Sequence, residues 1–221
     1  MKPKLVIFDF DGTLGDTRHN IVVTLQRTMS LLGLPLRSES ECASTIGLTL
    51  EDSFRTMYPE IDEAKAKECV MTYRDIFYQS IEELTPNLFE GVSDTLARLH
   101  AMDIKMSIAS SRSSPSLLLF LRNMAIADYF GTVLGSDNVT KHKPDPEPVL
   151  KIVAEYGVSP SEVLVVGDMP VDVLMAHSAG VRCVAVSYGN ATAEELAAVE
   201  ADYIIDRFAS LVDIIEGMSD R

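Results

Sequence analysis

The feature that most constrains the fold is a short apolar segment near the N-terminus that leads directly into two aspartates and a glycine. The segment Leu5–Phe8 is rich in branched residues, and Asp9, Asp11 and Gly12 follow it. A strand running through both aspartates would put their side chains on one face. Two carboxylates crowded at the end of a buried strand repel each other unless a cation or a shared proton intervenes. The arrangement therefore indicates chemistry rather than packing.

Further apolar, β-branched segments recur along the chain, and helical patterns separate the later ones. The expected strands cover residues 5–8, 104–109, 132–134, 163–166, 181–186 and 203–205. Strands that alternate with helices are typical of a parallel sheet covered by helices. We therefore predict an α/β fold.

The stretch from residue 16 to residue 86 has a different pattern. It contains no convincing strand, and its apolar residues repeat at helical spacing, as at Ile21 and Leu25. We expect residues 16–86 to form a small all-helical lobe inserted after the first strand and joined by two linkers. The core would then consist of residues 1–15 and 87–221.

Composition narrows the range of partners. The net charge of −14 provides no basic stripe for nucleic acid. No apolar stretch approaches the ~20 residues that cross a bilayer, and no signal peptide is evident, so we expect no membrane partner. The three cysteines form no CxxC pair, which favours a reducing, cytoplasmic location. Nothing in the sequence indicates an oligomeric state.

Polar residues follow four of the expected strands, at the point where each strand ends. In order along the chain they are Asp9 and Asp11, then Ser110, Ser111 and Arg112, then Lys143, then Asp168 with Asp172. Ligands of open α/β sheets bind beyond the carboxyl ends of the strands. We therefore expect these side chains to share one site.

These four features resemble, in type and order, the motifs of the haloacid dehalogenase superfamily of aspartate-nucleophile phosphotransferases. The motifs are DxDGT, a hydroxyl residue, a lysine in KPxP, and GDxxxD. The resemblance covers nearly the whole chain, because the helical insertion lies where the superfamily places its smaller cap. It implies a Rossmann-like core, a helical cap and Mg²⁺ as cofactor.

The resemblance also implies a role for each motif residue. Asp9 would be the nucleophile, and Asp11 would protonate the leaving group and later deprotonate water. Ser110 would donate a hydrogen bond to the transferring phosphoryl group, and Lys143 would neutralise its oxygens. The metal ligands would be Asp9, Asp168 and the backbone carbonyl of Asp11.

Other residues are expected to contact the substrate or to support this site, namely Gly12, Thr13, Ser111, Arg112 and Asp172. Gly12 permits a tight turn whose backbone amides can hold phosphate. Ser111 is the rival hydroxyl for the phosphoryl group. Asp172 would hold a water on the metal or support the lysine, and Arg112 would contact substrate or be solvated.

The second motif aspartate separates reaction classes within the superfamily. This chain has an acid at position 11, Asp11, where dehalogenase-like and phosphonatase-like members have another residue. β-Phosphoglucomutase-like members place a histidine where this chain has Ile21, and a Glu-Asp pair where it has Gly167-Asp168. We therefore predict a phosphatase similar to phosphoglycolate phosphatases, acting on a small phosphorylated metabolite. A mutase, or a pyrophosphatase on the same scaffold, is the alternative.

Two non-enzymatic alternatives stay open. Receiver domains also take up phosphate on an aspartate beside magnesium, but their acids come from different strands and they lack a helical insertion. A homologue that serves as a binding module would normally have lost Asp9, Asp11 or Lys143, and all three are present. Magnesium-dependent hydrolysis of an aryl phosphate would exclude both alternatives.

Overall fold

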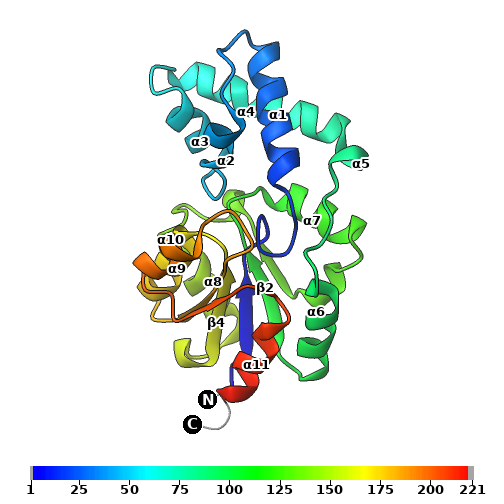
Figure 1. Cartoon of the computed structure of the whole chain (residues 1–221), viewed down its shortest axis with the longest axis vertical. Helices are drawn as coiled ribbons and strands as arrows, with labels where there is room; N and C mark the ends of the chain where they lie inside the picture. The colour runs from blue at the N-terminus through cyan, green and yellow to red at the C-terminus, as the bar shows by residue number, and fades with distance from the viewer. Residues whose placement is uncertain (1, 219–221) are drawn as a thin grey trace.

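The computed structural model describes residues 2–218. Figure 1 shows a core that contains the sheet and, above it, a separate lobe of helices. The sheet strands are β1 (Leu5–Phe8), β2 (Lys105–Ala109), β3 (Thr132–Leu134), β4 (Val163–Gly167), β5 (Arg182–Val186) and β6 (Tyr203–Ile205). Each lies within one residue of its predicted position at either end.

The six strands form one sheet in the order β3-β2-β1-β4-β5-β6, and all neighbours are parallel. This is the strand order of a Rossmann-like sheet. The chain builds outward from β1 to β3 and then returns to the other side of β1 with β4. The predicted α/β fold class is confirmed.

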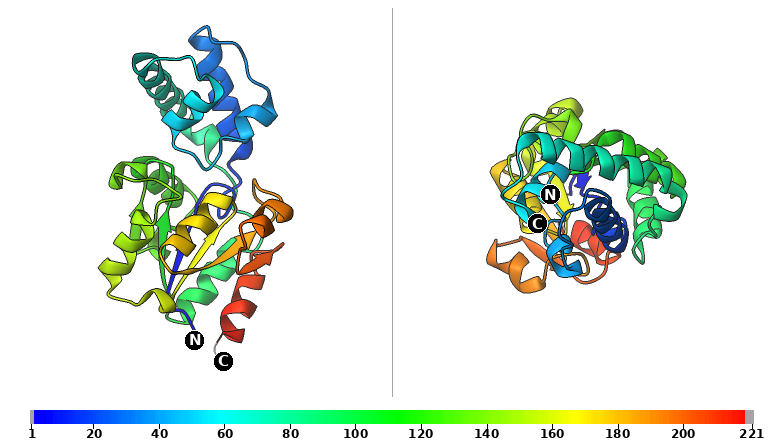
Figure 2. Two further views of the ribbon diagram at one scale, coloured as in Figure 1. Left: turned by 90° about the vertical axis from the view of Figure 1, so that its left-hand side faces the viewer. Right: turned by 90° about the horizontal axis from the view of Figure 1, so that it is seen from above.

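Helices cover both faces of this sheet (Figures 1 and 2). These helices are α6 (Val92–Ala101), α7 (Ser114–Asn123), α8 (Glu147–Tyr156), α9 (Pro170–Ser178), α10 (Ala193–Ala198) and α11 (Ser210–Gly217). Alternate residues of β1 point to opposite faces of the sheet. Val6 and Phe8 pack with α6, α7 and α11, whereas Leu5 and Ile7 pack with α8, α9 and α10. Short 3₁₀ turns lie at η1 (Ala127–Tyr129), η2 (Ser136–Asn138) and η3 (Pro160–Glu162).

The separate lobe is helical, as the apolar spacing predicted. Its helices are α1 (Arg18–Leu31), α2 (Glu39–Ala43), α3 (Leu50–Met57), α4 (Glu63–Gln79) and α5 (Ile81–Leu84). Helix α4 packs against α1 and α3 around a core that includes Leu25, Phe54 and Phe77. Within residues 2–218, every helix falls short of the length and hydropathy that a bilayer span requires.

Two linkers connect the helical lobe to the core side by side. The backbone N–H of Asp16 donates to the carbonyl of Asn87 at 2.9 Å, and that of Phe89 donates to Leu14 at 3.0 Å. Gly15 and Leu88 form an antiparallel bridge between these bonds. We therefore propose residues 16–86 as a cap domain on a core of residues 1–15 and 87–221.

Candidate active site

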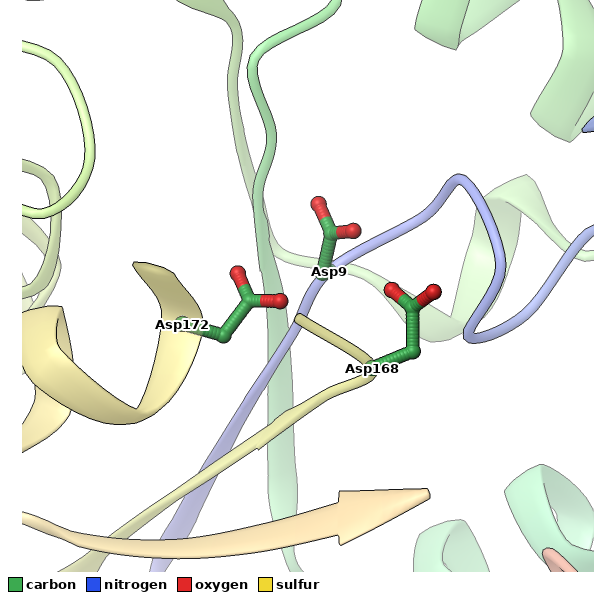
Figure 3. A group of neighbouring side chains, drawn as sticks. All are labelled: Asp9, Asp168 and Asp172. Carbon is green, nitrogen blue, oxygen red and sulfur yellow. The ribbon is translucent and has the colours of Figure 1, made fainter. Parts of the chain in front are cut away.

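The site lies where the strand order reverses, at the carboxyl ends of β1 and β4. Asp9 follows β1 directly and Asp168 follows β4 directly, so the pairing of these two strands places the aspartates side by side. Asp172, in the first turn of α9, joins them. The three carboxylates converge in Figure 3, and one oxygen of each lies within 4.8 Å of the others.

Lys143 connects two of these carboxylates. Its Nζ lies 2.7 Å from Asp9 Oδ1 and 2.6 Å from Asp172 Oδ1, and all three side chains are buried. The other Asp172 oxygen accepts a hydrogen bond from the backbone N–H of Met169 at 3.0 Å. Within residues 2–218, Lys143 is the only cation paired with the three-acid group. One ammonium thus faces three buried carboxylates.

This imbalance shifts the pKa values of Asp9, Asp168 and Lys143. Burial raises the pKa of Asp9 to about 7, although Lys143 opposes the shift. Burial, together with Asp9 and Asp172, raises the pKa of Asp168 well above its usual range. Burial disfavours the charge of Lys143, but Asp172 and Asp9 outweigh it and raise the lysine pKa. The cluster therefore lacks positive charge.

The donor set fits a hard divalent cation. The three aspartates offer carboxylate oxygens, which are the protein ligands that Mg²⁺ prefers, and a double positive charge would balance the excess of negative charge. Asp172 accepts hydrogen bonds on both oxygens, from Lys143 and Met169, whereas Asp9 accepts one on Oδ1, so Asp9 is the more available ligand of the two.

Asp168 is held in place by groups from two other loops. Its Oδ2 accepts hydrogen bonds from the backbone and side chain of Asn190 at 2.7 and 2.8 Å, and its Oδ1 accepts one from Thr13 Oγ1 at 3.2 Å. Gly12 has a φ of +83°, and a Cβ there would lie 2.1 Å from Asp168 Oδ2. Asn190 was not among the predicted site residues, although it follows β5 as the others follow their strands.

Asp11 lies outside the three-acid group and has its own cation. Arg112 holds both carboxylate oxygens: Nε donates at 3.2 and 3.0 Å, and Nη2 donates at 2.7 Å. The side chains of Arg112 and Asp11 are only 10% and 12% exposed. Of the two alternatives predicted for Arg112, contact with substrate or solvation, this burial excludes solvation. The expected crowding of Asp9 and Asp11 is relieved because β1 ends at Phe8 and each aspartate pairs separately.

Two neighbouring aromatic rings lie on one side of the Arg112 guanidinium. Its Cζ lies 5.5 Å from the ring centroid of Phe77 in α4 and 4.9 Å from that of Phe120 in α7, which places it between the cap and the core. Burial disfavours its charge, but Asp11 raises the pKa of Arg112. Sequence reasoning did not find Phe77, because its helical spacing is the same as that of the cap's apolar core.

The two candidate hydroxyls have different partners. Ser110 Oγ is buried and accepts a hydrogen bond from the backbone N–H of Arg112 at 3.2 Å, and its own hydrogen has no acceptor among residues 2–218. Ser111 Oγ instead donates to the backbone carbonyl of Gly47 in the cap at 2.6 Å. Ser110 is therefore the hydroxyl available to a ligand.

A cavity of about 280 Å³ lies between the cap and the core beside these groups. It is lined on the core side by Asp9, Asp11, Ser110 and Arg112, and on the cap side by Leu25 and Tyr73. Burial raises the pKa of Tyr73 to about 12, so its hydroxyl stays neutral. The size suits a small molecule rather than a polymer.

Comparison with known proteins agrees with this geometry. The chain is 34% identical over 214 residues to a probable phosphatase, IndB, of Dickeya dadantii. The matched region covers 96% of this chain and 93% of that protein. It is 32% identical to a phosphoglycolate phosphatase of Salmonella paratyphi A, over 94% of this chain and 90% of that protein. A protein named as a pyrophosphatase, PpaX, of Clostridium perfringens is also 32% identical, over 98% of this chain and 99% of that protein.

A solved structure has the same fold. The protein from Bacteroides fragilis, named as a haloacid dehalogenase-like hydrolase, superposes with a TM-score of 0.89 at 32% identity, covering 95% of this chain and 100% of that one. Residues 6–186 match the family described as haloacid dehalogenase-like hydrolase, and this range contains all the strand-end residues of the site except Asn190. The chain therefore belongs to the haloacid dehalogenase-like hydrolase family.

Proposed function

We propose that this hydrolase is a magnesium-dependent phosphatase that cleaves a small phosphomonoester through a phosphoryl group carried on Asp9. The chain is an enzyme of the phosphatase type, like the relatives named above. Among those names, phosphoglycolate phosphatase favours a small ester as substrate. The cavity of about 280 Å³ suits such a molecule.

The observation that carries the proposal is the bridge from Lys143 to Asp9 and Asp172 beside Asp168. It fixes the Asp9 carboxylate at a strand end that opens into the cavity. Asp9 and Asp168, with the backbone carbonyl of Asp11, would hold Mg²⁺. Bound there, the metal would supply positive charge against the phosphate dianion.

In the first half of the reaction, an Asp9 oxygen attacks phosphorus and the bond from phosphorus to the leaving-group oxygen breaks. Asp11 donates a proton to that oxygen, so the leaving group departs as an alcohol. Ser110 donates a hydrogen bond to a phosphoryl oxygen, and the Lys143 ammonium offsets the charge on the others. The hydrogen bond from Lys143 to Asp9 also keeps the nucleophile oriented.

In the second half, water attacks phosphorus and the bond from phosphorus to Asp9 breaks. Asp11 takes a proton from that water, which restores the acid for the next cycle, and inorganic phosphate leaves. The hydrogen bond from Ser111 to Gly47 joins the cap to the core at the edge of the cavity. Contact of this kind between cap and core limits bulk water around the reacting group.

Steady-state hydrolysis of a phosphate-ester panel tests the proposal. The panel contains phosphoglycolate, hexose phosphates, nucleotides and pyrophosphate, each measured with magnesium and with EDTA. We expect metal-dependent release of phosphate, with one ester preferred by about a hundredfold or more in kcat/KM. Pyrophosphate as the preferred substrate would favour the activity in the name of the Clostridium perfringens relative. No hydrolysis by folded protein would contradict the proposal.

A further inference from the structure

Arg112 is a buried cation with an unusual set of partners. Within residues 2–218, all the hydrogen bonds of its guanidinium go to the Asp11 carboxylate, through Nε and Nη2. Phe77 and Phe120 lie together on one side of the guanidinium, and neither ring supplies a second carboxylate or carbonyl acceptor. Arg112 also lines the cavity between cap and core, so a bound molecule can reach it.

This pairing restricts the part that Asp11 plays in the reaction. Arg112 donates to both Asp11 oxygens, which fixes the plane of the carboxylate and leaves fewer lone pairs to contact the leaving-group oxygen. Asp11 can turn toward that oxygen more freely when Arg112 releases part of the carboxylate. A guanidinium that is 10% exposed and loses its partner carries a large desolvation cost. A substrate that brings its own anion removes that cost.

The transferring phosphoryl group has other partners. It is placed at Asp9, where Lys143 and Ser110 supply the positive charge and the hydrogen-bond donor. Arg112 contacts Asp11 and not Asp9, so its guanidinium lies on the leaving-group side of the site.

We propose that Arg112 is a specificity-determining residue that binds a second anionic group on the leaving-group part of the substrate, exchanging Asp11 for that group. The planar fork of arginine suits either a carboxylate or a second phosphate. The exchange frees Asp11 to meet the leaving-group oxygen, so esters without a second anion are poorer substrates. This inference rests on the proposed phosphatase function.

A matched set of substrates isolates the second anion. Phosphoglycolate carries a carboxylate, its glycolamide analogue is neutral at the same position, and ethylene glycol bisphosphate carries a second phosphate. For the wild type we expect kcat/KM to be about thirtyfold or more higher for an anionic member than for the amide. Which anionic member is faster distinguishes a carboxylate from a phosphate.

Variants then assign this preference to Arg112. Arg112→Met should lower the anion-to-amide ratio by about thirtyfold, and Arg112→Lys should retain part of it, because the charge stays but the fork is lost. Arg74 is an exposed arginine that lines the same cavity, and Arg74→Met should change the ratio by less than about threefold. Should Arg112→Met fail to fold in a thermal melt, the ratio for Arg112→Lys decides.

Equal losses of kcat/KM on the charged and neutral esters would overturn the proposal, because Arg112 would then serve Asp11 or the transferring phosphoryl group. A wild type without preference for the anionic members would overturn it as well. Should the wild type hydrolyse none of the three, the phosphatase function fails separately. Calorimetric affinity of wild type and Arg112→Met for the same three compounds then tests Arg112, and an unchanged ratio of affinities would contradict the proposal.

Discussion

The two walls of the cavity are built differently. On the core side, Asp9 and Asp11 line the cavity and each is fixed by a largely buried cation: Lys143 pairs with Asp9, and Arg112 pairs with Asp11. On the cap side, the wall includes apolar and aromatic side chains such as Leu25 and Phe77. We therefore propose that the core carries out the reaction and, through Arg112, selects for charge, whereas the cap shapes the cavity around the substrate.

The largest expected effect comes from breaking the charge bridge in the core. Lys143→Met leaves Asp9 and Asp172 buried without their cation, and we expect the free energy of unfolding of the metal-free protein to fall by about 3 kcal/mol. Lys141→Met is the matched control, because its side chain is 71% exposed and should cost less than about 0.5 kcal/mol. Denaturant unfolding measures both. An equal loss of unfolding free energy in Lys143→Met and Lys141→Met would contradict a stabilising bridge specific to Lys143.

Substitutions at two glycines with positive φ compare the core with the cap. Gly12 and Gly33 both have positive φ, but a Cβ meets Asp168 at Gly12 and nothing within 4 Å at Gly33. We expect Gly33→Ala to lower the free energy of unfolding by about 1 kcal/mol. Gly12→Ala should cost at least about 1 kcal/mol more and reduce kcat by about tenfold or more, since it displaces Asp168. Unaltered turnover in Gly12→Ala would show that the position of Asp168 is not critical.

The effect of magnesium on stability should depend on pH. The raised pKa values of Asp9 and Asp168 mean that their protons stabilise the metal-free fold below the unfolded pKa of about 3.9, and this contribution is lost as pH rises, through about 7 for Asp9. Magnesium replaces those protons. The difference in melting temperature between magnesium and EDTA should therefore be larger near pH 8 than near pH 5.5. An equal difference in melting temperature at the two pH values would contradict magnesium binding at Asp9 and Asp168.

The smallest expected effect concerns the contact of the cap with the core. Ser111→Ala removes the hydrogen bond to Gly47 and should raise KM by about threefold to tenfold with little change in kcat. Ser110→Ala removes the proposed donor to the phosphoryl group and should reduce kcat by about tenfold or more. Steady-state kinetics on one ester separates the two. A lower kcat in Ser111→Ala, with only a raised KM in Ser110→Ala, would assign the phosphoryl contact to Ser111 and not to Ser110.

Much of the fold and the position of the site could be predicted from the sequence. The branched residues of each strand identify the sheet, and parallel strands bring their carboxyl ends to one edge, so strand-end polar residues such as Asp9 and Asp168 had to meet. The helical spacing of Ile21 and Leu25 likewise predicted the helical lobe.

Pairings between distant residues could not be predicted in the same way. Arg112 is bound to Asp11 across 101 positions of sequence, and no local pattern indicates this partner. Asp9 is likewise bound to Lys143 across 134 positions of sequence. Phe77 has the spacing of any buried helical residue, so its contact with Arg112 needed the structure.

The central claim is that Asp9 carries the phosphoryl group, and trapping that group tests it most directly. Enzyme quenched during turnover and treated with borohydride should contain homoserine at Asp9, within the tryptic peptide between Lys4 and Arg18, because borohydride reduces an acyl phosphate. Asp9→Asn should show no such product and should retain less than about 1% of wild-type kcat. Homoserine at another aspartate, or an Asp9→Asn enzyme that remains active, would contradict the account.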